Sequence, residues 1–466
     1  EQTWRHTQLP AKARDHLDKL IDRIQDLEEH IAVEPDIVER IRLESERTLL
    51  IAERSRFERQ LRDRLHTAPS SPRPPTLDEL RARLAPDTAL VSVLHSGDTW
   101  WALVILRNAP AQFIDLQDPD LGLNASAWVQ RLRGEAVRAW PLPGNRVKLD
   151  VVRPENAVGP YFTLDQLAKR LSDRLLLPLK EAVGNARHLV IVGDDELVGA
   201  PLQALPLGSG FALDRFEISY APSLATYFRW QVPARSDAHA LELLAIGAVD
   251  YQPIAPLVTD DAIAISVQVA ENHPLPFARA EIDAIAALFP GARTTTWEGS
   301  QANKEALRRV SRSGALRRYR YVHIAAHAWA QADQPESSAI VLSGTDEDLP
   351  THRALTAAEL AGFQMGSELI VLSACDTAAG HFEHGQGLLG LAYAGLAAGN
   401  RAALLSLWPV ADDTTARFMV GLYAKLRRGE TPALALAATQ REFRHSGDPT
   451  LSDPLVWAPF ILYGGY

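Results

Sequence analysis

Short apolar runs recur from residue 76 to the end of the chain, and helical segments lie between most of them. Three of the most apolar runs are Tyr319–Ala325, Glu368–Ser373 and Ala402–Leu407. Strands of a parallel sheet are apolar throughout because both of their faces are buried, and a crossover, usually a helix, joins each strand to the next. The alternation therefore predicts an α/β fold, with a mainly parallel sheet flanked by helices on both faces.

The pattern divides this region into a first half, residues 76–240, and a second half, residues 241–466. In the first half we expect strands at Ala89–Leu94, Trp100–Leu106, Phe113–Leu116, His188–Val192 and Phe216–Tyr220. In the second half we expect them at Leu243–Gly247, Tyr319–Ala325, Ala339–Leu342, Glu368–Ser373, Ala402–Leu407 and Phe460–Tyr463. The expected helices are Leu164–Ala182, Ala280–Leu288, Lys304–Val310, Leu355–Ala361, Gln386–Ala398, Asp412–Arg428 and Thr431–His445.

A helical segment, residues 1–67, precedes these halves, and a Pro/Ser-rich linker at residues 68–75 separates it from them. Its apolar residues are spaced by three and four positions, which places them on one face of a helix, and Pro35 interrupts the pattern. We expect a helical hairpin that couples the α/β region to an upstream sensor or partner. Because the first residue is Glu1 and not Met, we also expect the sequence to be a piece of a longer protein.

Charge and cysteine content exclude several classes of function. The formal net charge of −10 leaves no basic excess to neutralise phosphates, which argues against direct nucleic-acid binding. We find neither an apolar run long enough for a membrane helix nor a signal peptide, so we expect a cytoplasmic protein that does not contact membranes. A single cysteine allows no internal disulfide and no multi-thiolate zinc site.

That cysteine and one histidine each follow an apolar run. His327 follows Tyr319–Ala325, and Cys375 follows Glu368–Ser373, 48 positions later (375 − 327). Functional groups gather at the carboxyl ends of strands in open parallel sheets. If the two strands are neighbours, the thiol and the imidazole meet there. Caspases have their histidine about 50 residues before the cysteine.

Such a pair is suited to nucleophilic catalysis. A thiol with a pKa of about 8.5 is only partly ionised at neutral pH, and an adjacent imidazole can accept its proton and later protonate the leaving amine. The backbone N–H groups of Ala328 and Cys375 are the natural donors to an oxyanion. The alternative is structural: His327 is then a core histidine and Cys375 an inert buried thiol.

Further motifs are shared with a known family. They are Tyr321–His327, Leu372–Thr377, Gly385–Leu391, Ala397–Gly399, Ser406–Val410 with Asp412 and Thr415, Trp457, Phe460 and, in the first half, His188–Val192, Leu202–Pro206 and Ser219–Ser223. In these motifs the chain resembles the CHAT family, a branch of the caspase-like (clan CD) cysteine peptidases that is often linked to tetratricopeptide repeats. The resemblance covers residues 76–466 and implies a degenerate pseudo-caspase first half and an active second half.

The resemblance implies a cysteine endopeptidase without a cofactor, with Cys375 as nucleophile and His327 as base. It further implies regulated proteolysis in bacterial defence or cell death. A gasdermin-like protein or another effector would be the substrate, and a sensor or tetratricopeptide-type partner would act upstream. Two alternatives stay open: a catalytically inactive CHAT scaffold for protein–protein signalling, and an acyltransferase or hydrolase that acts on a non-peptide substrate.

Two positions depart from the family pattern, and a third differs from several relatives. Ala328 stands where the family usually has Gly, and Gln386 where it often has Glu. Several relatives that cleave after basic residues have an acid two positions before the nucleophile, where this chain has Ser373. Their selectivity therefore does not transfer.

The remaining candidate residues are less specific. Substrate contacts are expected from Asp376, Glu383, Trp408 and Asp412, which lie near the predicted cleft; helix caps, loop charges and a buried indole are the alternatives. We expect His323 to be structural. We expect no metal site, because the pair His381 and His384 has no evident third ligand.

Overall fold

The computed structural model describes most of the chain from residue 75 onward. The described ranges are 75–96, 99–132, 137–141, 147–151, 162–193, 197, 199–230, 239–247, 275–329, 337–344, 350–373, 386–408 and 410–465, with isolated positions between 19 and 50. These isolated positions are all helical. Most of the predicted N-terminal helical segment and nearly all of the linker lie outside the described residues.

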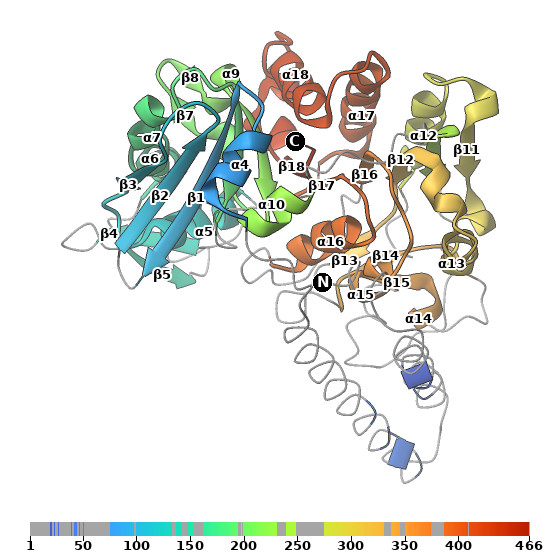
Figure 1. Ribbon diagram of the computed structural model, residues 1–466. Coiled ribbons are helices and arrows are strands. Elements are labelled where there is room, and N and C mark those ends of the chain that lie inside the picture. The colour runs from blue at the N-terminus through green and yellow to red at the C-terminus, as the bar shows by residue number, and fades with distance from the viewer. Residues whose placement is uncertain are drawn as a thin grey trace.

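One sheet of eleven strands runs through both halves of the α/β region (Figure 1). In spatial order the strands are β11 (Thr294–Trp297), β10 (Leu241–Ile246), β12 (Tyr319–Ile324), β16 (Leu369–Leu372), β17 (Ala402–Ser406), β18 (Phe460–Gly464), β9 (Glu217–Ala221), β6 (His188–Val192), β1 (Thr88–Ser96), β2 (Thr99–Leu106) and β3 (Gln112–Asp115). Only the pairs β17–β18, β1–β2 and β2–β3 of this sheet are antiparallel. The predicted fold class, α/β with a mainly parallel sheet, is confirmed.

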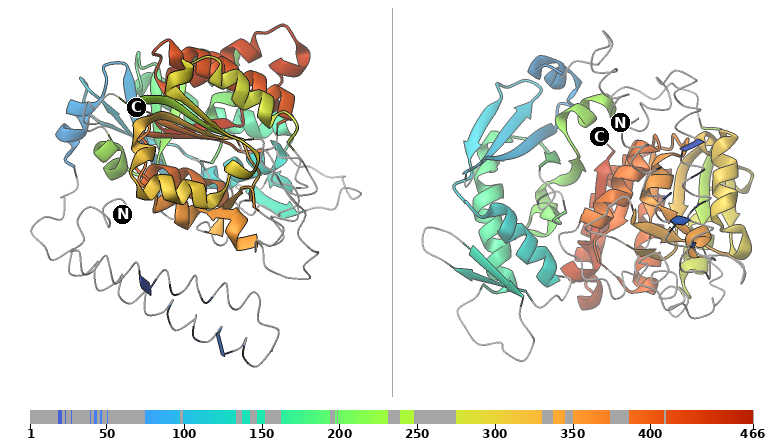
Figure 2. Two further views of the ribbon diagram at one scale, coloured as in Figure 1. Left: turned by 90° about the vertical axis from the view of Figure 1, so that its right-hand side faces the viewer. Right: turned by 90° about the horizontal axis from the view of Figure 1, so that it is seen from below.

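Helices cover both faces of the sheet. In the second half, α12 (Ala278–Ala286), α17 (Asp412–Arg427) and α18 (Pro432–Arg444) lie on one face, and α13 (Lys304–Arg312), α15 (Ala357–Ala361) and α16 (Gln386–Ala397) on the other (Figure 2). In the first half, α4 (Leu77–Arg83) and α10 (Leu224–Trp230) pack on one face. The other face packs against α5 (Leu121–Leu132), α6 (Leu164–Leu171), a π-helical turn (Ser172–Leu176) and α7 (Leu177–Ala182).

The strands and helices predicted between residues 76 and 466 are all present, with bounds that differ by two residues or fewer. The largest change of type concerns Leu355, which was expected to begin a helix but lies in β15 (Ala354–Thr356). The Thr356 side chain accepts a hydrogen bond from the Glu359 amide, and the Glu359 carboxylate accepts one from the Thr356 amide. This capping box makes Thr356 the N-cap, so that α15 begins at the next residue.

Several elements were not predicted. Strand β11 reads Thr294-Thr295-Thr296-Trp297 and lies at the sheet edge, where it pairs only with β10 and is not strongly apolar. Helix α5 begins Leu-Gly-Leu-Asn, which is unfavourable by helix propensity, but it buries Leu121, Ala125 and Trp128. The hairpin of β4 (Val137–Pro141) and β5 (Val147–Val151) was also missed. In β11 and α5, tertiary packing outweighs the local sequence signal.

A separate small sheet lies just after His327. It contains β13 (Ala328–Trp329), β14 (Ala339–Val341) and β15, all antiparallel. The Lys304 ammonium, at the start of α13, donates to the carbonyl oxygen of Ala354 at 2.9 Å and lies 2.8 Å from the Glu359 carboxylate. These contacts attach the small sheet to the helices beneath it.

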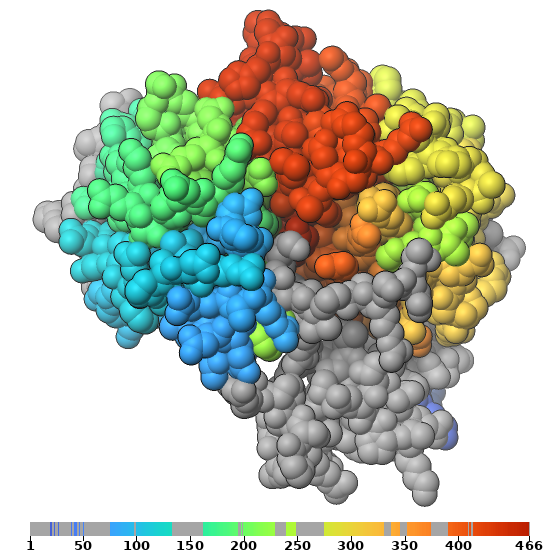
Figure 3. Space-filling model, turned by 45° about the horizontal axis from the view of Figure 1, so that its top comes forward, coloured from blue at the N-terminus to red at the C-terminus, as the bar shows by residue number. Residues whose placement is uncertain are grey.

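The two halves join through β9 and β18, which run parallel with Tyr463 opposite Tyr220. One hydrophobic core cluster extends across this junction. In Figure 3 the α17–α18 region (red) lies between the first half (blue to green) and the elements from α12 onward (yellow). In the described part of the chain we find no helix with the length and apolar character that a membrane crossing requires.

Candidate active site

Three neighbouring parallel strands, β12, β16 and β17, end at the same edge of the sheet. Leu372 of β16 is paired with Ile324 of β12 on one side and with Leu405 of β17 on the other. The Ser373 amide then donates to the Ile324 carbonyl oxygen at 2.9 Å, so the ladder between β12 and β16 continues past the last paired residues. The strands that lead to His327 and Cys375 are therefore neighbours, which is the condition under which the sequence analysis expected the two side chains to meet.

The register of these strands aligns the candidate residues. His327, Cys375 and Trp408 each come three positions after one member of the row Ile324, Leu372 and Leu405. The offset of 48 between β12 and β16 (369 − 321) equals the sequence separation of His327 and Cys375. Since neighbouring strands lie about 4.8 Å apart, the two segments leave the sheet side by side. Cys375 itself, like Asp376 and Glu383, lies outside the described residues.

His327 is fixed by the backbone on both sides. The side chain is buried, with 3% of its surface exposed. Its carbonyl oxygen accepts a hydrogen bond from the Val341 amide at 2.8 Å, and the preceding Ala325 amide donates to the Ile246 carbonyl oxygen at 2.7 Å. The imidazole therefore projects from a short segment that is held between the main sheet and the small sheet.

The register of the small sheet determines where the Ala328 amide points. Ala328 is opposite Ile340, while the neighbouring pair, His327 and Val341, makes the backbone hydrogen bond. In an antiparallel ladder, hydrogen-bonded and non-hydrogen-bonded pairs alternate, and the N–H groups of a non-hydrogen-bonded pair point away from the partner strand. The Ala328 N–H is therefore directed away from β14.

Ser373, two positions before Cys375, is described and buried, with 4% of its surface exposed. Its hydroxyl has no hydrogen-bond partner among the described residues. A serine here adds no negative charge beside the row.

Trp408, which comes three positions after Leu405 of the row, is buried and anchored by hydrogen bonds. Its indole Nε1–H donates to the Leu455 carbonyl oxygen at 2.9 Å, and its own carbonyl oxygen accepts from the Ser406 hydroxyl at 2.7 Å. Only 5% of the residue is exposed. Asp412 is the first residue of α17.

His323 lies in the interior of β12, four positions before His327. The ring is fully buried, with Nε2 2.8 Å from the Glu281 carboxylate of α12, and makes an edge contact with Tyr423 of α17. Burial raises the pKa of Tyr423 well above its usual value, and the nearby Tyr321 and Glu281 raise it further. These contacts hold β12 against α12 and α17.

The described residues contain no group of three or more His, Cys, Asp or Glu side chains that could hold a metal ion. His381 and His384 lie outside the described residues.

Comparison with known sequences identifies one family. The family model of the CHAT domain matches residues 165–465, about two thirds of the chain, and includes the whole row. Tetratricopeptide repeat protein 28 of Mus musculus is 32% identical over 136 residues, which is 28% of this chain and 5% of the relative. The Homo sapiens protein of the same name is 32% identical over 110 residues, 24% of this chain and 4% of the relative. The chain thus spans only a small part of these relatives.

Comparison with solved structures gives weaker likenesses. A structure of the Saccharomyces cerevisiae separase–securin complex is 11% identical and covers 83% of this chain and 30% of that chain, with a TM-score of 0.45. The Arg-specific cysteine proteinase gingipain R is 12% identical and covers 67% of this chain and 69% of that chain, with a TM-score of 0.36.

Proposed function

Because the chain belongs to the CHAT domain family, we propose that it is a caspase-like cysteine endopeptidase in which Cys375 is the nucleophile and His327 the base. The observation that carries the proposal is the shared register: both residues come three positions past paired residues of neighbouring parallel strands. A thiol and an imidazole that leave adjacent strands at one level are within reach of each other.

The reaction follows from this pair. His327 takes the proton of the Cys375 thiol, and the thiolate attacks the carbonyl carbon of the scissile peptide bond. The tetrahedral intermediate collapses to a thioester as the leaving amine takes the proton from His327. A water molecule, deprotonated by His327, then attacks the thioester, and the thiol is regenerated with release of the new carboxylate.

Backbone amides stabilise the oxyanion of both intermediates in this proposal. The direction of the Ala328 N–H supports its role, because it points away from β14 and is not used by that ladder. The Cys375 amide is the second donor. Preorganised donors of this kind contribute about 3 kcal/mol each to transition-state stabilisation in enzymes that use them.

We assign substrate contacts to Asp376, Glu383, Trp408 and Asp412. The burial of Trp408 supports a role for its ring as a wall behind the site rather than as an exposed platform. Several relatives that cleave after basic residues have an acid two positions before the nucleophile. The uncharged Ser373 at this position supports a different substrate selectivity for this chain.

In this proposal the protease is regulated. The curated relatives are tetratricopeptide repeat proteins, which supports an upstream repeat-type sensor or partner acting through the N-terminal helical segment. The substrate is then a protein, such as a gasdermin-like effector, cleaved in bacterial defence or cell-death signalling in the cytoplasm. Family likeness is the only support for this context.

The alternative is a catalytically inactive CHAT scaffold, and labelling of Cys375 distinguishes it. A peptidyl electrophile at neutral pH is expected to alkylate Cys375 in the wild type. His327→Ala is expected to lose the labelling, while the matched control His445→Ala, at an exposed histidine of the same half, keeps it. If the wild type is not labelled even in the presence of an activating partner, the proposal that the chain is an enzyme is wrong.

A peptide library then tests the reaction class. Cleaved peptides in the wild type, and none with Cys375→Ala, are expected. Turnover of small thioesters or esters without any peptide cleavage would instead identify an acyltransferase or hydrolase.

A further inference from the structure

The first half contacts the second half at a turn that lies next to the row of candidate residues. This turn, residues 457–460, connects α20 (Pro454–Trp457) to β18. Gln203 belongs to a short 3-10 helix of the first half, Leu202–Ala204. Its side-chain amide donates to the carbonyl oxygens of Ala458 at 2.8 Å and Phe460 at 3.3 Å.

The same turn supports the loop that carries Trp408. The Leu407 amide donates to the Pro459 carbonyl oxygen at 2.9 Å, and the Trp408 indole donates to Leu455 of α20 at 2.9 Å. Leu407 is therefore held by the turn that Gln203 contacts, and Trp408 by the helix that leads into this turn. That segment also receives Gln440 of α18, whose amide donates to Trp457 and Phe460 at 3.0 Å each.

We propose that Gln203 is a positioning residue, through which the first half holds the turn 457–460 and thereby the Leu407–Trp408 loop beside Cys375. The proposal rests on the proposed function for its effect on catalysis. Gln203 is 4% exposed, so its two N–H donors meet the carbonyls in the absence of competing water. In this proposal the first half, which supplies neither Cys375 nor His327, positions a loop of the active site through Gln203.

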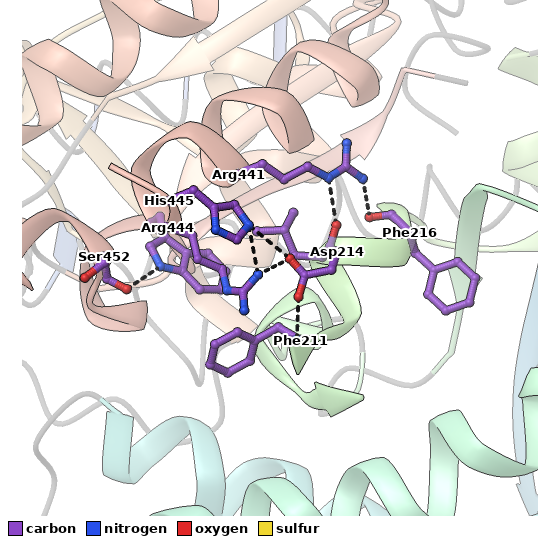
Figure 4. Close-up of polar contacts among 9 residues, drawn as sticks. Phe211, Asp214, Phe216, Arg441, Arg444, His445 and Ser452 are labelled. Carbon is purple, nitrogen blue, oxygen red and sulfur yellow. Dashed lines mark hydrogen bonds and ion pairs between the residues drawn. The ribbon is translucent and has the colours of Figure 1, made fainter. Parts of the chain in front are cut away.

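Other contacts across the junction lie elsewhere and provide a control. Arg441 of α18 donates to the carbonyl oxygens of Leu213 and Phe216, and Arg444 forms an ion pair with Asp214 of α9 (Ala212–Arg215) (Figure 4). His445 lies 3.5 Å from the same carboxylate. These hydrogen bonds and ion pairs join α18 to α9 and do not involve the backbone of the turn 457–460; the Phe211 ring, over which Arg444 lies, makes an edge contact with the Trp457 side chain.

The test compares Gln203→Met with Arg444→Gln in the full chain. Methionine has nearly the shape of glutamine but no donors, while Arg444→Gln removes an ion pair of the same junction. Hydrogen exchange, followed by mass spectrometry, is measured on peptides covering residues 403–410, and the alkylation rate of Cys375 is measured in parallel. Exchange about tenfold faster and alkylation about tenfold slower are expected for Gln203→Met, as the loss of two buried donors predicts. Both rates are expected to stay within twofold of wild type for Arg444→Gln.

Unchanged exchange in Gln203→Met would overturn the proposal, whatever the alkylation rate. Equal increases in both variants would also overturn it, because the junction as a whole would then be responsible. Where Gln203→Met does not fold, Gln203→Asn, which keeps an amide but draws it back from the carbonyls, is measured in the same way. Exchange does not depend on catalysis, so a wild type that is never alkylated would count against the proposed function alone.

Discussion

The two halves share one sheet but place a histidine at opposite ends of their parallel strands. His188 is the first residue of β6, is buried, and has Nε2 2.8 Å from the Ser219 hydroxyl of β9. His327 comes three residues after the last residue of β12. Burial lowers the pKa of His188 to about 4, with Asp87 opposing the shift, so its ring is neutral at physiological pH.

In the proposed function, this difference assigns the histidine of the first half to stability and that of the second half to catalysis. At the carboxyl ends of parallel strands the loops diverge and leave room for a ligand, whereas the amino ends pack into the fold. In the first half, β6 continues into Gly193-Asp194-Asp195 and β9 into Pro222-Ser223, without a cysteine or histidine. The first half therefore has no cysteine–histidine pair in the segments that follow β6 and β9.

Replacing each of these two histidines by a residue that does not titrate is expected to give the largest difference between the halves, in the alkylation rate of Cys375. His327→Ala is expected to slow alkylation of Cys375 about a thousandfold or more, because the thiol loses its base, and also to lower the free energy of unfolding, because the ring is buried. His188→Gln is expected to leave alkylation within twofold and to lower stability. Rates from mass spectrometry and denaturant unfolding of both variants measure the contrast. A loss of alkylation in His188→Gln with its fold intact would contradict the division of roles.

The small sheet, which orients Ala328, is the next point to perturb. Lys304→Met removes a buried ammonium that holds β15 through Ala354 and pairs with Glu359. We expect a loss of about 3 kcal/mol in the free energy of unfolding, since a partly buried carboxylate loses its most buried partner. Arg308, 2.5 Å from the same carboxylate but more exposed, is the matched control. Arg308→Met is expected to cost about 1 kcal/mol by chemical denaturation. Equal losses would show that the buried position of Lys304 is unimportant.

The pH dependence of stability tests the buried state of His188. An unfolded histidine takes up a proton near pH 6.5, but the folded His188 does so only near 4. Between these values the unfolded state binds more protons, so the free energy of unfolding falls as the pH is lowered. From pH 7 to pH 5 the loss attributable to this residue is about 2 kcal/mol. His188→Gln is expected to flatten this slope in denaturant titrations. If the slope of the free energy of unfolding against pH is unchanged in His188→Gln, groups other than His188 cause the pH dependence.

Much of the fold could be predicted from the sequence, because the central strands are buried on both faces and apolar throughout. The runs leading to β12, β16 and β17 are of this kind, and all three were located within two residues. Edge strand β11 was missed because three of its four residues are threonines and only one neighbour buries it.

The candidate site was predictable only in part. The sequence placed His327 and Cys375 after two apolar runs, and the structure pairs the strands that these runs form. The contact of Gln203 with Ala458 joins residues 255 positions apart. No local pattern could indicate it, because it depends on how β9 and β18 meet. The anchoring of Trp408 by Leu455 has the same origin in tertiary packing.

The smallest expected effect concerns the departure at Ala328. This residue is 2% exposed, and its N–H points away from β14, toward the side where we place the oxyanion. Ala328→Gly removes the methyl group next to this N–H but keeps the donor, so alkylation of Cys375 is expected to be about twofold faster. The expected loss of stability is below about 1 kcal/mol. Ala326→Gly, a buried neighbour on the same segment, is the control and is expected to lower stability without raising the rate. The alkylation rate at saturating electrophile separates the two. A tenfold slower reaction in Ala328→Gly would show that the methyl group holds the donor in place rather than crowding it.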